Sequence, residues 1–435
     1  MTETETAARD DSYPRPIIAW ATVAILFFAY IFSFIDRMII SLLVEPLKAE
    51  FEVSDTMIGL LMGPAFALFY TFAGLPIGRL IDRTRRLRIA GIGAAVWCAM
   101  TAASGMAGSF WQLFAARIGV GVGEATLSPA AYSVISDSFP KKRLGLAMGV
   151  YSLGSATGAG LAFLLGGFVV ALVTNAGSFS LPLVGALEPW RVVFIAVGLP
   201  GLIIAAMLWM LPEPARKGVV TDGDHATLRD LFAFLKSRAG FISMHFLAVG
   251  MVNLAVFAAV SWTAVLFVRV HGFGVAESGY LTGAALIVGG MIGLIGGGWL
   301  SDKAGGSVKA RMAVCGGAAV VGAICAAFYS LVPNPWLAAF IFVFFFAAGA
   351  TPIGVAAAAL QQVAPNRMRA TVSAAYLFVV NFVGLVIGPP AVAALADTMF
   401  PGEEGIRYSI AIISPIGYAV AIVCFFLAMR FAGED

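Results

Sequence analysis

Four charged residues lie inside long apolar stretches of the sequence, where charge is costly. Asp36 and Arg37 interrupt the run 17–44, and Arg117 and Glu124 interrupt another run further along the chain. A charged group at bilayer depth costs about 3 kcal/mol on insertion scales, so such groups pair with one another and mark functional sites. Two acids and two bases sum to zero charge, and we predict that they meet between two membrane helices.

The same four residues could bind a proton and an anion. Arg117 and Glu124 are seven positions apart, which places both side chains on one face of a helix. Burial disfavours an ionised carboxyl group, whereas a nearby arginine favours it. We therefore predict that Asp36 and Glu124 take up and release protons, with Arg37 and Arg117 as their charge partners and as groups for an anionic substrate. The alternative is a static ion-pair cluster that only orients the two helices.

The stretches that carry these charges belong to a strongly apolar chain. Of its 435 residues, 60% are hydrophobic and 12% are charged, whereas a soluble protein carries about 25% charged residues. Successive apolar stretches are each long enough to cross a hydrocarbon core of about 30 Å. We predict twelve membrane spans, at 17–44, 56–79, 88–108, 110–136, 144–173, 191–211, 240–269, 277–300, 310–331, 336–362, 370–396 and 407–431.

The distribution of basic residues predicts the orientation of these spans. Of the 27 lysines and arginines, 21 lie on one side of the membrane, which carries the N-terminus and the ends of the even-numbered spans. The exceptions are Arg37 and Arg117 within spans, and Lys48, Arg191, Arg269 and Arg407 near the opposite face. Because basic loops stay in the cytoplasm, we expect both termini, 1–16 and 432–435, to be cytoplasmic tails.

The chain is predicted to consist of two halves that repeat each other. The longest break, 212–239, separates six-span bundles at 17–211 and 240–431, and its apolar residues recur at the spacing of a short amphipathic surface helix. "GRLIDR" at 78–83 returns as "GWLSDK" at 298–303, between the second and third span of each half. Parallel repeats of this kind are typical of transporters with a substrate site near the membrane midplane.

On this motif the chain resembles the major facilitator superfamily, whose loop reads Gly-x-Leu-x-Asp-Arg-x-Gly-Arg-Arg. The matching residues are Gly78, Leu80, Asp82, Arg83 and Arg86. Arg85 replaces the second glycine, which the second copy keeps as Gly305. The resemblance implies an all-α membrane protein with the major facilitator fold, in which twelve transmembrane helices form two six-helix halves related by pseudo-two-fold symmetry.

The repeated motif predicts a latch on the cytoplasmic side. Its two leading glycines allow helices to approach closely, and Arg83 or Arg86 can pair with Asp137 at the end of the fourth span. Asp82 and Asp302 are expected to be buried at the membrane edge, which ordinary positive loop charge does not explain. The predicted gate comprises Gly78, Asp82, Arg83, Arg86, Asp137, Gly298, Asp302 and Lys303.

A narrower resemblance rests on the charged residues themselves. "I-D-R" at 35–37, "R-I-G-V-G-V-G-E-A" at 117–125 and "D-S-F-P" at 137–140 are similar to the Spinster family. This resemblance implies a transporter of lysophospholipids or sphingosine phosphate that is driven or gated by protons. The acid and base of its first span correspond to Asp36 and Arg37, and the acid of its fourth span to Glu124.

These observations predict a proton-coupled secondary transporter that works by alternating access on an amphipathic, lipid-like anion. We expect a monomer in a bacterial inner membrane, with protons, the bilayer and a small amphipathic or anionic substrate as partners, and with no nucleic acid, cofactor or metal. The alternatives are a proton-linked carrier of a small organic anion or drug, and a transport-derived membrane receptor. An enzyme is not expected, because His225, His245 and His271 lack the spacing of metal ligands and no nucleotide loop occurs.

Three polar residues of the second half are candidates for substrate contact. They are Asn253 in the seventh span and Tyr376 and Asn381 in the eleventh. The alternative for all three is an ordinary hydrogen bond between helices, which polar side chains make throughout membrane proteins.

Overall fold

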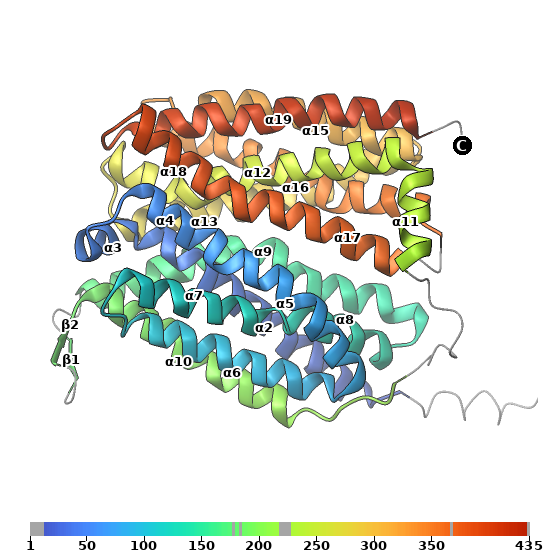
Figure 1. The fold of residues 1–435 in the computed structure, drawn as a ribbon, viewed down its shortest axis with the longest axis horizontal. Helices are drawn as coiled ribbons and strands as arrows, with labels where there is room; N and C mark the ends of the chain where they lie inside the picture. Colours follow the sequence, from blue (N-terminus) through green and yellow to red (C-terminus); the bar gives the residue numbers. More distant parts are fainter. Residues whose placement is uncertain (1–12, 176–178, 182–184, 217–227, 366–368, 433–435) are drawn as a thin grey trace, which may run out of the picture. The chain divides into compact units, whose positions relative to one another are not determined.

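The protein is almost entirely α-helical (Figure 1). The computed structural model describes residues 13–175, 179–181, 185–216, 228–365 and 369–432. A short antiparallel pair, β1 (Phe179–Leu181) and β2 (Gly185–Leu187), is the exception among these residues. The predicted all-α fold class is confirmed.

Eleven helices in the described ranges are long and apolar enough to cross a membrane. Each coincides with one of the predicted spans, because the hydropathy that marks a span in the sequence also marks a helical segment of membrane length. The segment 55–74 is divided at Gly63 into two helices. The predicted span 110–136 is not among the eleven. It forms two helices, α7 (Phe110–Glu124) and α8 (Leu127–Ser138), of 15 and 12 residues.

By contacts, the chain divides into two compact units, and the first contains residues 1–39, 69–165 and 169–219. Besides α7 and α8, the helices that lie wholly or mostly in this unit are α2 (Pro16–Leu42), α5 (Pro64–Arg83), α6 (Arg86–Ser104), α9 (Lys141–Asn175) and α10 (Pro189–Met210). Helices α6 and α10 run side by side (Figure 1). A Cβ atom on Gly198 of α10 would lie 2.6 Å from the backbone nitrogen of Ala102, so this close approach requires glycine.

The second unit contains residues 40–68, 166–168 and 220–435. Its elements are α3 (Val44–Phe51), α4 (Asp55–Met62), α11 (Leu228–Ser237), α12 (Ala239–Arg269), α13 (Val275–Met291), η1 (Ile292–Gly296), α14 (Gly297–Lys303), α15 (Val308–Phe328), α16 (Pro335–Val363), α17 (Arg369–Asn381), η3 (Phe382–Ile387), α18 (Gly388–Met399) and α19 (Gly405–Phe431). The contacts therefore group 40–68 with the second unit, and the boundaries drawn from the sequence repeat stay a prediction.

Helix α4 shows why residues 40–68 belong to the second unit. It packs closely on α18, where a Cβ atom on Gly59 would lie 3.0 Å from Ala393 Cβ and 3.0 Å from Pro390 Cα. Helix α19 packs on both α12 and α15 in the same unit (Figure 1). The amphipathic helix predicted in the linker is confirmed as α11.

The break between α7 and α8 has a local cause. Pro129 has no N–H group to donate to the carbonyl oxygen four residues earlier, and its ring crowds that oxygen. Thr126 Oγ1 donates to the carbonyl oxygen of Gly123 at 2.9 Å, which adds a bond that competes with the helical pattern. Helix α6 lies against this break, because a Cβ atom on Gly93 would be 2.0 Å from Thr126 Oγ1 and 2.6 Å from Gly123 O.

We expect Gly93→Ala to destabilise the protein. The added methyl group would clash with a backbone oxygen that cannot rotate away, and overpacking of this kind costs about 1–3 kcal/mol. Gly317→Ala in α15 is the matched control, because a Cβ atom there meets no atom within 4 Å. Thermal unfolding in detergent should show a lower midpoint for Gly93→Ala only, and equal midpoints for the two variants would contradict the packing described here.

Candidate functional site

Helices α2 and α7 are joined by two crossed ion pairs. Arg37 Nε donates to Glu124 Oε2 at 2.7 Å, and Arg117 Nη1 donates to Asp36 Oδ1 at 2.8 Å. Arg117 also donates through Nη2 to the backbone oxygen of Asp36 at 3.0 Å. The acid of each helix thus pairs with the base of the other, and the structure brings together the four charges that were expected to meet.

Helical spacing positions these side chains. Ser33, Asp36 and Arg37 are three and four positions apart on α2, so they share one face. Glu124 is the last residue of α7, directly before the break. Ser33 Oγ donates to Glu124 Oε2 at 2.7 Å, so this serine is a fifth member that the sequence analysis missed. We call Ser33, Asp36, Arg37, Arg117 and Glu124 the charge cluster.

Three of the four charged side chains are inaccessible to solvent. Asp36, Arg117 and Glu124 are 1–2% exposed, whereas the side chain of Arg37 is 13% exposed. Among the described residues, Asp36 Oδ2 and Glu124 Oε1 have no hydrogen-bond partner. Each carboxylate therefore keeps one oxygen that can accept a proton without breaking a bond, and Arg37 is the least buried of the four charged side chains.

Aromatic rings surround Arg37. Its guanidinium carbon lies 5.2 Å from the ring centre of Phe34 and 5.0 Å from that of Tyr70, within the range of cation–π attraction. Tyr30 stacks on Tyr151 with ring centres 5.0 Å apart. These tyrosines come from α2, α5 and α9, and sequence reasoning missed them because each lies singly within an apolar run.

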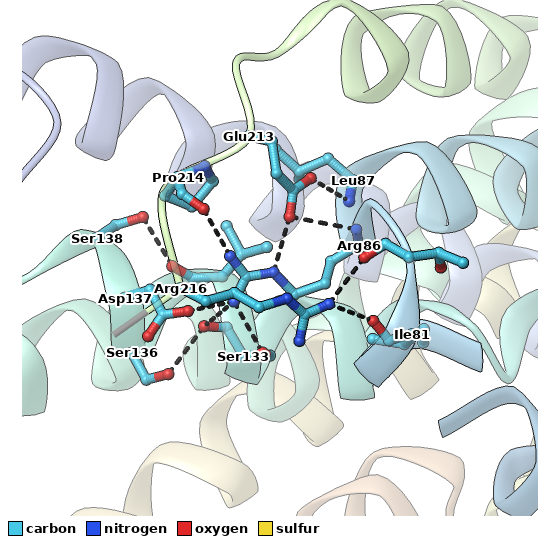
Figure 2. A network of polar contacts seen from close by, with 12 residues as sticks. Ile81, Arg86, Leu87, Ser133, Ser136, Asp137, Ser138, Glu213, Pro214 and Arg216 are labelled. Atoms are coloured by element: carbon cyan, nitrogen blue, oxygen red, sulfur yellow. Dashed lines mark hydrogen bonds and ion pairs between the residues drawn. The ribbon is translucent and has the colours of Figure 1, made fainter. Parts of the chain in front are cut away.

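A second polar network centres on Arg86 at the start of α6 (Figure 2). Its buried guanidinium contacts Asp137 and donates to Glu213 Oε1 at 2.7 Å, to the carbonyl oxygen of Pro214 at 2.8 Å and to Ser133 Oγ at 2.9 Å. One arginine therefore joins the end of α8 to the segment that follows α10. We call Arg86, Ser133, Asp137, Glu213 and Pro214 the Arg86 network.

The segment after α10 also holds the turn between α5 and α6 (Figure 2). Arg216 Nη2 donates to the carbonyl oxygens of Ile81 at 2.7 Å and Thr84 at 2.8 Å, and the backbone N–H of Leu87 donates to Glu213 Oε2 at 3.0 Å. Sequence reasoning missed Glu213 and Arg216. The available signal was the charged run "PEPARK", which directly follows the predicted span 191–211.

The structure decides between the two arginines proposed for the gate. Arg86 makes the contact with Asp137, whereas Arg83 is exposed. The side chain of Asp82 lies outside the described residues. A Cβ atom on Gly78 or Gly298 would meet no described atom within 4 Å, so the expected close approach of helices at these glycines is not observed.

The second copy of the motif does not repeat these contacts. The predicted burial of Asp302 is wrong, because its side chain is 78% exposed and its Oδ1 lies 3.9 Å from Arg311 Nη2. Lys303 Nζ lies 4.8 Å from the ring centre of Trp299. Helix α14 ends at Lys303 and the chain turns away through glycines 305 and 306, which have positive φ angles. This early turn leaves the acid in solvent.

The three candidates for substrate contact lie on α12 and α17, which pack on each other. Tyr376 is buried in the second unit, with its ring centre 5.5 Å from those of His245 and Phe246. Asn253 and Asn381 are half-buried, and neither side chain forms a hydrogen bond to another described residue. Tyr376 therefore packs among aromatic rings in this structure, and the role of all three residues in substrate contact stays a prediction.

A third charged network lies at the end of α12. Arg269 donates to both carboxylate oxygens of Asp55, at 2.7 and 2.9 Å, and to Glu45 Oε1 at 2.6 Å. Lys48 Nζ donates to Asp55 Oδ1 at 2.6 Å. These four residues, the Arg269 network, line a cavity of about 270 Å³ together with Asp397. The sequence analysis placed Lys48 and Arg269 on one face but did not foresee that they share an acid.

The described residues contain no arrangement suited to a bound metal or a redox pair. No three or more His, Cys, Asp or Glu side chains lie together where they could hold a metal ion. The four cysteines, Cys98, Cys315, Cys325 and Cys424, are free.

Comparison with known proteins decides the family. A sequence model of the Major Facilitator Superfamily matches residues 26–389. The chain belongs to the major facilitator superfamily. It is a multi-pass membrane transporter and not an enzyme, as the loop motif predicted, and it is similar in sequence and structure to Spinster proteins.

Individual relatives agree with this assignment. A crystal structure of a bacterial homologue of the human lysosomal transporter Spinster, inward-facing and unoccupied, superposes with a TM-score of 0.79 at 25% identity, over 96% of this chain and 97% of that one. An MFS-type efflux pump of Mycolicibacterium smegmatis is 26% identical over 95% of this chain and 93% of its own. A sphingosine-1-phosphate transporter of Xenopus tropicalis is 26% identical over 61% of this chain and 49% of its own.

We expect Arg86→Gln to destabilise the first unit strongly, because it leaves Asp137 and Glu213 without their shared cation. Removing one partner of a buried ion pair costs about 3–5 kcal/mol. Arg83→Gln is the matched control, since Arg83 belongs to the same motif but is exposed. Thermal unfolding in detergent should show a lower midpoint for Arg86→Gln than for Arg83→Gln. Equal midpoints would show that the stability depends on the total positive charge of the loop and not on the buried ion pairs of Arg86.

Proposed function

We propose that this chain is a proton-coupled secondary transporter that works by alternating access on an amphipathic, lipid-like anion such as a lysophospholipid or a sphingoid phosphate. The observation that supports the proposal is the pair of crossed ion pairs between α2 and α7. Buried pairs add little net stability compared with well-packed apolar residues, so a purely structural role is a weak reason to keep four charges within two spans.

Proton uptake would change the charge of the cluster. When both acids and both bases are ionised the sum is zero, and one added proton leaves a net positive charge. An uncompensated cation in a low-dielectric setting attracts an anion strongly. Loading a proton would therefore create a binding site for an anion, and release of the proton would abolish it.

The geometry favours the ion pair between Glu124 and Arg37 as the one that breaks when a proton is bound. Arg117 holds Asp36 by two hydrogen bonds and is itself buried, so this pair is closed to a ligand. Arg37 is partly exposed, and Glu124 Oε2 accepts from both Arg37 and Ser33 while Oε1 is unpartnered. A proton on Oε1 would weaken the attraction to Arg37 without first requiring any bond to break.

Arg37 would then bind the head group of the substrate. A guanidinium presents a planar set of donors that matches two oxygens of a phosphate. The rings of Phe34 and Tyr70 hold the guanidinium by cation–π contact, so the guanidinium stays oriented when its ion pair with Glu124 breaks. The relative that transports sphingosine 1-phosphate supports a substrate with this head group.

The two peripheral networks are suited to gating. The Arg86 network ties the repeated motif to the segment after α10, on the side that the basic loops assign to the cytoplasm. The Arg269 network joins residues from the two sequence repeats, so exposing a site from that side would require its ion pairs to part. Asp82 and Gly78 remain part of the proposed inner gate. We place the protein in a bacterial inner membrane with both termini in the cytoplasm.

A second candidate function is a proton-linked carrier of a small organic anion or drug. The tyrosines beside Arg37 favour it, because their hydroxyl groups offer hydrogen bonds that a lipid tail does not use. The efflux pump among the relatives is in accord with this alternative.

We expect Glu124→Gln and Asp36→Asn each to abolish the effect of pH on transport, because the amides keep the shape of the acids but cannot exchange a proton. Lysophospholipid uptake into proteoliposomes, with and without an imposed pH gradient, measures this. Glu188→Gln, which removes an exposed acid of the first unit, should leave the gradient effect intact. A pH response like that of the wild type in both site variants, with folding verified by thermal unfolding, would rule out proton coupling at these residues.

We expect acidification to tighten binding of a phosphate-bearing lysolipid, because protonation of Glu124 releases the guanidinium of Arg37 from its ion pair. Calorimetry at acidic and at neutral pH should show roughly tenfold weaker binding for Arg37→Lys, since an ammonium does not replace a planar fork. Arg37→Ala should lose both binding and its pH dependence, while Arg85→Ala, at an exposed arginine, should change neither. If Arg37→Ala binds the lysolipid as the wild type does at both pH values, Arg37 is structural.

A further inference from the structure

The second unit carries a groove that the transport site does not use. It has a volume of about 630 Å³ and runs along one face of α19 beside the start of α15. Lys309 and Arg430 line one end, and apolar side chains including Val423, Phe426 and Met429 line the rest. None of these residues belongs to the charge cluster or to either peripheral network.

The two cations meet because their helices run in opposite directions. Lys309 is in the first turn of α15 and Arg430 is in the last turn of α19, and the two helices pack along their length. Both side chains are exposed, and among the described residues neither forms a hydrogen bond or an ion pair with an acid. The nearest acid of the preceding turn, Asp302, faces Arg311 instead. Within the described part of the chain, this end of the groove therefore carries two positive charges with no acid paired to them.

The rest of the groove is suited to a hydrocarbon chain. Val423 is 58% exposed and Phe426 is 53% exposed, and with Arg430 they recur three and four positions apart on one face of α19. Large side chains exposed along a membrane helix contact lipid rather than water. The apolar stripe leads directly to the two cations, so an occupant must be apolar over most of its length and anionic at one end.

We propose that this groove binds an anionic phospholipid of the surrounding bilayer. Lys309 and Arg430 hold the head-group phosphate, and an acyl chain lies along Val423 and Phe426. Basic side chains at the cytoplasmic ends of membrane helices recognise anionic head groups, with attraction that falls off within a Debye length. The basic-loop distribution assigns this end of α19 to the cytoplasm, where anionic lipid would meet the cations.

A second groove shows what sets this one apart. Helices α6 and α10 form a groove of about 540 Å³ along residues such as Ile92, Val96 and Trp209, and no charged side chain lines it. That surface offers a lipid tail the same apolar contact but gives an anionic head group no partner. Selectivity for anionic lipid is therefore expected only at the groove beside α15 and α19.

Calorimetry on the full-length protein in detergent tests the proposal with short-chain phosphatidylglycerol as the probe. We expect short-chain phosphatidylcholine to bind about 20-fold more weakly, because two cations each contribute to the anionic head group. Lys309→Gln with Arg430→Gln should reduce binding of phosphatidylglycerol to the level of phosphatidylcholine. Lys309→Arg with Arg430→Lys should retain it, since the charge is kept, and Val423→Ala with Phe426→Ala should weaken both lipids.

Matched controls separate this site from general attraction to a basic protein. Arg88→Gln with Arg143→Gln removes two exposed cations from the first unit and should leave binding unchanged. Equal loss in the two double variants, or wild-type binding by Lys309→Gln with Arg430→Gln, would overturn the proposal. Binding of glycerol phosphate as tight as that of phosphatidylglycerol would also overturn it, because the occupant would then be a soluble phosphate. None of these measurements involves transport, so their outcome does not depend on whether the proton-coupling proposal is correct.

Discussion

The pairing of charge across α2 and α7 is the constraint on which the first unit depends. Four ionised groups in a low-dielectric interior are tolerable only if each acid lies within hydrogen-bond distance of a base. That requirement fixes the rotation of α2 and α7 about their own axes and the position of Glu124 along the axis of α7. The close packing of α6 at Gly93 against the break after α7 holds this position, because neither backbone can move without a clash.

Arginine provides the junction in all three networks. Arg86 and Arg269 each bind two carboxylates from different segments, and Arg37 binds a carboxylate while two rings hold its planar face. A guanidinium stays charged and offers donors in several directions, so it can join segments that are distant in sequence. Because a formed pair adds little net stability but a broken one is costly, such networks favour discrete closed and open arrangements over intermediate ones.

The two copies of the loop motif are alike in sequence but not in structure. In the first copy the helix after the loop begins at Arg86, which points the guanidinium toward Asp137 and Glu213. In the second copy Asp302 is exposed and pairs loosely with Arg311. The second unit concentrates its buried charge at Arg269 instead, and Lys309 and Arg430 are exposed beside α15 and α19. The two copies of the motif therefore have similar sequences but place their charged side chains in different environments.

The sequence by itself determined the fold class, nearly all of the spans and the identity of the four charges in the cluster. Apolar runs of membrane length can fold in few ways, since backbone groups in hydrocarbon must bond within a helix. A charge inside such a run is conspicuous for the same reason. Only the tertiary structure decided that Arg37 pairs with Glu124 and Arg117 with Asp36, that Arg86 rather than Arg83 meets Asp137, and that Glu213 joins them. Those choices depend on how far each helix is rotated and shifted against its neighbour, and hydropathy carries no information about that, because a lipid-facing and a protein-facing apolar side chain look the same in sequence.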